Sequence, residues 1–145
     1  MATPYDAVIR VRKRESDEAA NMLREAVDRL SALERERDAA RAAIAMEINN
    51  AVADTTVRSD FYLLRMYALI ENLAGPISQA ETIVDERRDQ LLQLLVETKA
   101  LERVAESYRE SRRQSIDSAE QSQVDDRVAF LHRTRIRAER EGRYP

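Results

Sequence analysis

Ionisable side chains are abundant in this sequence, but their types and spacing match few catalytic arrangements. Its 145 residues include 27 Asp and Glu, a single His and no Cys. His132 lies among arginines, so we expect it at a surface or interface rather than as a general base. No phosphate-binding glycine loop, dinucleotide fingerprint, zinc-ligand spacing or nucleophile elbow occurs. These observations predict a protein that is not an enzyme and that holds no metal or cofactor.

Arginines concentrate near the C-terminus and are the clearest candidates for recognition chemistry. Residues 127–145 contain six Arg against two Glu, whereas residues 59–126 contain 8 basic and 14 acidic groups. One interpretation is a solvated helix end, where cations suit the helix dipole. The other is a docking tip for an acidic partner surface, formed by Arg133, Arg135, Arg137 and Arg140. Nucleic acid is not an expected partner, because no aromatic platform accompanies the charge.

The elements that carry these groups are predicted to be long helices. Apolar or small residues recur at alternating steps of three and four residues from Ile9 to Ala51, and again from Ile77 to Tyr108. This heptad spacing is typical of a helix that lies along another helix. The main predicted seam positions are Leu23, Leu30, Leu33, Ile44, Leu91, Leu94, Leu101 and Tyr108.

Two breaks are predicted between these helices. Residues 54–60 have poor helix propensity, and Gly75-Pro76 is the only internal pair of strong helix breakers. We therefore expect helices at about 8–53, 60–74 and 76–140, fraying at residues 1–6 and a helix end before Gly142. The predicted fold is an all-α, single coiled-coil domain spanning residues 1–145. It is a long antiparallel two-helix hairpin with a short apolar segment or kink in the middle; a parallel homodimer of continuous helices is the alternative.

The segment from Phe61 to Ile70 is apolar on nearly every face. A helix that packs on one partner buries only one stripe, so something must cover the remainder. The first explanation is packing across the end of the hairpin. The second is a partner-binding patch formed by Phe61, Tyr62, Met66 and Leu69.

The block Lys99-Ala100-Leu101-Glu102-Arg103 opens a charged run about forty residues before the C-terminus. In this pattern the sequence resembles the FliJ family of flagellar type III export proteins. The run closes with Asp125-Asp126 before an apolar pair and a basic tail. The early stretch at residues 14–20, the central apolar segment, the size and the absence of Cys are also similar. Injectisome stalk proteins are a related family that the sequence does not separate from this one.

The resemblance implies a non-enzymatic stalk and adaptor of the export apparatus. The end of the hairpin that carries both termini would enter a hexameric, FliI-like export ATPase. The middle of the chain, near Leu69 and Tyr62, would bind the FlhA-like export gate, and export chaperones would be further partners. The implied location is cytoplasmic, peripheral to the inner membrane at the flagellar base, without insertion into the bilayer. The alternative is a generic cytoplasmic coiled-coil scaffold or dimerisation protein without an ATPase partner.

Overall fold

The chain forms two long helices in a computed structural model that describes residues 1–53 and 60–142. Helix α1 spans Asp6–Ala53 and helix α2 spans Asp60–Glu141, and no strand occurs within these described ranges. The two helices pack against each other, so the predicted all-α helical hairpin is confirmed. The break expected at residues 54–60 falls on residues 54–59, which lie outside the described residues, and on Asp60, where α2 begins.

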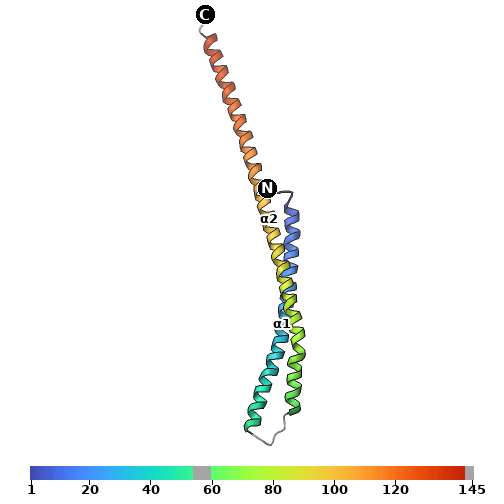
Figure 1. Cartoon of the computed structure of the whole chain (residues 1–145). Coiled ribbons are helices and arrows are strands. Elements are labelled where there is room, and N and C mark those ends of the chain that lie inside the picture. The colour runs from blue at the N-terminus through green and yellow to red at the C-terminus, as the bar shows by residue number, and fades with distance from the viewer. Residues whose placement is uncertain (54–59, 143–145) are drawn as a thin grey trace. The chain divides into compact units, whose positions relative to one another are not determined.

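Residues 10–98 form one compact unit in which the two helices run side by side (Figure 1). In α1 every predicted heptad position from Arg12 to Ala51 is buried or half-buried. In α2 the same holds from Ile77 to Thr98, and the heptad extends backwards through Leu73 to residue 63. The periodicity therefore located both seams correctly, because only one stripe of each helix can face the other helix.

Small and polar residues hold much of this seam. The most deeply buried positions of the 10–98 unit include Ala40, Ala80 and Val84, whereas Leu91 and Leu94 are only half-buried. Two buried polar side chains satisfy their hydroxyl groups within their own helix. Ser16 Oγ donates to the Arg12 carbonyl at 2.9 Å, and Thr98 Oγ1 donates to the Leu94 carbonyl at 2.7 Å. Burying a hydroxyl group costs little free energy when the group has a hydrogen-bond partner. Ser16 and Thr98 can therefore occupy buried seam positions.

Residues 1–9 and 99–145 form the second unit, in which the N-terminal residues are held in place. The Thr3 amide and hydroxyl donate to the two carboxylate oxygens of Asp6, each at 2.7 Å, and the Asp6 amide donates to the Thr3 carbonyl at 3.2 Å. Arg109 of α2 bonds both Asp6 Oδ1 at 3.1 Å and the Met1 carbonyl at 3.3 Å. The predicted fraying of residues 1–6 is therefore wrong for this segment. These hydrogen bonds supply the partners that a free terminus lacks.

A full break at Gly75-Pro76 is wrong, because α2 continues through both residues, whereas a kink there stays a prediction. Gly75 and Pro76 are exposed, whereas Leu73, Ile77 and Ala80 around them are buried in the seam. Proline removes one hydrogen bond to the carbonyl four residues earlier, here that of Asn72, which is also an exposed residue. Seam packing on both sides holds the helix together, so residues 60–74 are the start of α2 and not a separate helix.

The end of α2 agrees with the prediction in position but not in conformation. The helix ends at Glu141, and the Gly142 amide donates to the Ala138 carbonyl at 2.9 Å. Gly142 has no positive φ, so the left-handed glycine cap is not used here. From residue 111 to residue 142 every residue is exposed. The regular seam thus stops at Tyr108, as the loss of the heptad after that residue predicts.

Leu101 tests the seam. Leu101 is half-buried on the heptad, and Leu92 on the same helix is 54% exposed. Leu101→Asp should lower the free energy of unfolding by about 1–3 kcal/mol, because the change places a charge in a one-layer interface. Leu92→Asp is the matched control and should change it by less than about 0.5 kcal/mol. Urea melts followed by circular dichroism measure both. Equal losses for the two variants would reject Leu101 as a seam residue.

Gly75 tests the continuity of α2. A Cβ added at this residue meets nothing within 4 Å, and its φ is not positive. Gly75→Ala should therefore raise the free energy of unfolding by roughly 0.5–1 kcal/mol through helix propensity. Gly142→Ala is the control, since its Cβ would lie 3.3 Å from the Ala138 carbonyl oxygen at the helix end. A loss of stability in Gly75→Ala would show that this residue is not in an ordinary helical turn.

Candidate interaction surfaces

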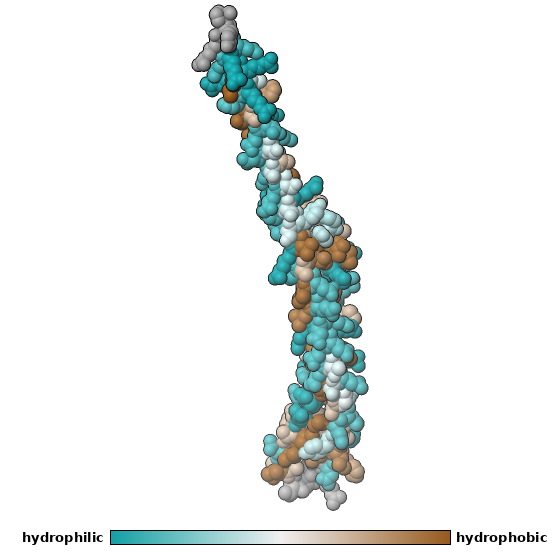
Figure 2. Space-filling view, turned by 45° about the horizontal axis from the view of Figure 1, so that its top comes forward, coloured by the Kyte–Doolittle hydropathy of each residue, from teal (hydrophilic) through white to brown (hydrophobic). Residues whose placement is uncertain are grey.

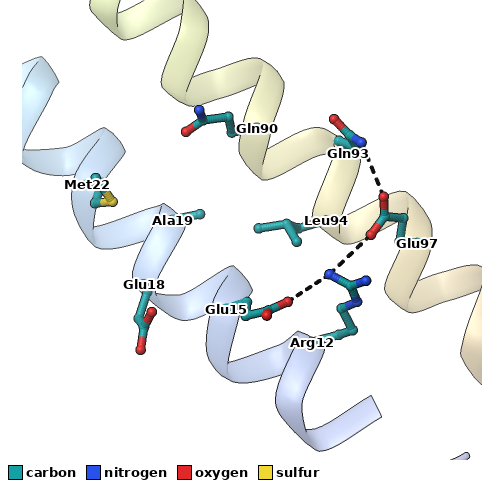
Figure 3. A pocket seen from close by; sticks show the side chains of 9 residues that line it. All are labelled: Arg12, Glu15, Glu18, Ala19, Met22, Gln90, Gln93, Leu94 and Glu97. Atoms are coloured by element: carbon teal, nitrogen blue, oxygen red, sulfur yellow. Dashed lines mark hydrogen bonds and ion pairs between the residues drawn. The ribbon is translucent and has the colours of Figure 1, made fainter. Parts of the chain in front are cut away.

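A shallow groove of about 410 Å³ lies between the two helices of the 10–98 unit. Figure 3 shows its walls, with Ala19 and Met22 of α1 facing Leu94 of α2. At one end Arg12 Nη1 lies 2.9 Å from Glu15 Oε2 and 3.5 Å from Glu97 Oε2. All of these charged groups are substantially exposed. The groove exists because Ala19 is small, and its one arginine–carboxylate cluster ties α1 to α2.

The central apolar segment contributes its own stripe to the seam. Leu63, Met66, Ile70 and Leu73 continue the heptad of α2 backwards from Ile77, and all four are buried or half-buried. Met66, predicted to bind a partner, therefore lies on the seam. Tyr62 and Leu69 are half-buried beside that stripe. These three predicted contact residues already serve internal packing to differing extents.

The opposite face of this segment is open. Phe61, Leu64 and Tyr67 are 84%, 63% and 53% exposed. We call these three residues the outer face. Near the end of α1, Met46, Ile48 and Val52 are also exposed. Figure 2 shows apolar surface gathered where α1 ends and α2 begins, beside the grey residues. Of the four predicted contact residues, Phe61 alone belongs to this open apolar surface.

The four arginines of the predicted docking tip are all exposed but do not share one face. Arg133, Arg137 and Arg140 are four and three residues apart, so they project from the same side of α2. Arg135 follows Arg133 by two residues and so lies about 200° further round the helix. Two of the four already have partners within the helix: Arg135 pairs with Glu139 at 3.1 Å and Arg137 with Glu141 at 2.9 Å. Exposed pairs of this kind contribute only about 0.3–0.5 kcal/mol, so they exchange easily for a partner's carboxylates.

Comparison with known proteins supplies the family. The family model described as the flagellar FliJ protein matches residues 1–137 of the 145-residue chain. The chain belongs to the FliJ family. Membership gives this FliJ-family chain a role related to flagellar protein export, and no catalytic family is indicated. No curated protein and no solved structure matches it.

A second apolar region of this FliJ-family chain was visible in the sequence without a role assigned to it. Val124, Val128 and Leu131 lie four and three residues apart on α2 and are 57–64% exposed. Phe130 borders them, and a shallow hollow of about 370 Å³ is lined by Asp126, Arg127, Phe130 and Leu131. The signal was the return of apolar residues in a new heptad frame after Tyr108. An exposed stripe of this kind on a single helix marks a surface for another chain.

Membrane-spanning helices and metal-binding clusters are absent from the described parts of this FliJ-family chain. Neither helix, over residues 1–53 and 60–142, contains an apolar stretch that could cross a lipid bilayer. Over the same residues, no three His, Asp or Glu side chains gather as a metal site. His132 is exposed.

Proposed function

We propose that this FliJ-family chain is a non-enzymatic stalk and adaptor of the flagellar export apparatus. Its C-terminal helical segment would enter the ring of a FliI-like export ATPase. Its central segment would bind an FlhA-like export gate. Export chaperones would be further partners. The observation that carries the proposal is the family match over residues 1–137. The exposed surfaces of α2 support it, because each offers side chains that have no role in the hairpin seam. The adaptor would act in the cytoplasm at the inner-membrane face of the flagellar base.

Charge supports the ring contact. Arg133, Arg137 and Arg140 form one exposed basic face on a helical segment that nothing within the described residues covers. A segment of this type docks by long-range attraction to acidic groups, and such attraction raises the rate of encounter. An adaptor couples two partners only if its affinity for one partner depends on the conformational state of the other partner. The chain would act as an adaptor in this way.

The ring contact can be tested by comparing the two sides of the basic helix. Arg133→Glu combined with Arg137→Glu should reduce capture of the purified FliI-like ATPase at least tenfold, because both charges leave the same face. Arg135→Glu combined with Arg127→Glu changes the charge equally on other faces and should have a clearly smaller effect. Binding of the unaltered chain should weaken as salt shortens the Debye length from about 10 Å at 0.1 M to about 3 Å at 1 M.

Circular dichroism must show equal helicity in these variants for the comparison to count. Equal capture of the ATPase by the unaltered chain and by the Arg133/Arg137 variant would remove this face from the interface. Equal loss in both double variants would show that net charge alone matters and that no face is selected.

The outer face supports the gate contact. Phe61 and Leu64 are the most exposed apolar side chains of the central segment, and they take no part in the seam that Met66 joins. Aromatic anchors commonly dominate interface energies, at roughly 2 kcal/mol or more when truncated. The gate contact is therefore proposed to centre on Phe61, with Tyr62 and Leu69 at its border.

The gate contact is tested by separating binding from stability. Phe61→Ala with Leu64→Ala should abolish capture of the purified cytoplasmic domain of the gate protein, yet change the free energy of unfolding by less than about 1 kcal/mol, since both side chains are exposed. Leu92→Ala with Leu95→Ala is the matched control, because it removes two exposed leucine side chains elsewhere on α2. Tyr62→Ala with Leu69→Ala should cost more stability, because both residues are half-buried.

Two results would count against this assignment. Retained binding by the Phe61/Leu64 variant would exclude the outer face. Loss of binding by the Leu92/Leu95 control to the same extent would show that the assay reports general apolar adhesion and not this surface.

A further inference from the structure

The part of α2 beyond the seam carries two charge blocks of opposite sign. Residues 117–126 contain four acidic side chains and no basic one, while residues 127–140 contain five Arg and one Glu. The blocks are adjacent on one helix, and their net charges are −4 and +4, counting His132 as neutral. All of these residues are exposed.

The exposed apolar stripe runs through the junction of the two blocks. Val124 lies in the acidic block, whereas Val128 and Leu131 lie in the basic one. Extending their spacing by alternating steps of three and four gives a new heptad frame, with positions 114, 117, 121, 124, 128, 131, 135 and 138. Residues 114–138 cover about 36 Å at 1.5 Å per residue. This stretch is long enough for several layers of helix–helix packing.

Two copies of this segment have complementary charges only when the two helices run antiparallel. In a parallel pair, acidic block would face acidic block and basic would face basic, which is unfavourable. In an antiparallel pair centred on residue 126, each acidic block lies along the partner's basic block. The heptad frame agrees with that centre, since position 124 then faces 128 of the second copy and position 117 faces 135. Both apolar and charged layers are therefore matched by the same twofold register.

We propose that residues 114–138 of α2 bind the same segment of a second copy of this chain as an antiparallel helix pair. The interface is isologous, so each residue contributes twice. Val124 and Val128 form its central apolar layers. Asp117 faces the second copy's Arg135 in two symmetric layers, which makes the association sensitive to salt. The proposal concerns the chain without any export partner and does not depend on the function proposed above.

Charge reversal with mixing tests the pairing. The first variant carries Asp117→Arg, and the second carries Arg135→Asp. Sedimentation velocity of the unaltered chain should show the mass rising with concentration from 16.7 kDa toward twice that value. Each variant alone should remain near the mass of one chain, because its facing charges are alike. An equimolar mixture should regain the pair, since every facing charge is again opposite. A mixture that stays at the mass of one chain, or an unaltered chain that never exceeds it, would overturn the proposal.

Disulfide trapping tests the direction. The chain has no Cys, so an introduced thiol has no competitor. Gln114→Cys mixed with Ala138→Cys should give a mixed disulfide-linked pair under mild oxidation, because positions 114 and 138 face each other in the proposed register. Each variant alone should give little, since two copies of position 114 would lie about 36 Å apart. Efficient linkage of either variant with itself would instead indicate a parallel pair or random collision, and would reject the antiparallel register.

Discussion

A hairpin of two helices has a core that is only one layer thick, and most features of this protein follow from that constraint. Each helix can hide a single stripe, so the seam is the main source of apolar burial. Ala40, Ala80 and Ala105 are among its most buried residues, which lets the backbones approach closely while burying little area per residue. Stability must therefore come from many weak layers, helped by ties such as Arg109 with Asp6.

The same constraint determines where function can reside. Within the described residues, the grooves between the helices are shallow and charged at their rims. What remains is surface: an apolar outer face at the start of α2, and a charged segment at its end whose residues are all exposed. Both surfaces use side chains that the seam does not need. Their sequences can change without a cost in folding, which is compatible with the adaptor role proposed above.

Sequence reasoning succeeded where one physical rule dominated. The heptads from Ile9 to Ala51 and from Ile77 to Tyr108 located the buried stripes, because periodicity reports directly which side of a helix is covered. It failed at Pro76, where local propensity was outweighed by packing of Leu73, Ile77 and Ala80 on both sides of the break. It also failed at Thr3 and Asp6, because a short hydrogen-bonded turn has little signal until its tertiary partner, Arg109, is known.

The central segment shows an intermediate case. Its apolar character was recognised, but the side that meets α1 was not, so Met66 was grouped with the binding residues. Counting backwards from Ile77 by steps of four and three would have reached Leu73, Ile70, Met66 and Leu63. That extension was hidden by Gly75-Pro76, which was interpreted as the end of a helix. Partner-binding residues could not be identified in the same way. Periodicity reports which residues pack inside the hairpin, whereas contacts with another protein impose no such pattern on one chain.

The layered seam also has an evolutionary consequence. Each layer of the hairpin interacts chiefly with the layers above and below it, much as units do in a repeat protein. Inserting seven residues into α1 and seven at the facing position of α2 would add two layers and leave every other layer in register. Inserting a single residue would instead turn the rest of that helix by about 100° and expose its stripe. Natural length variation in hairpins of this kind should therefore occur in matched multiples of seven, so that the hairpin lengthens or shortens by two layers at a time.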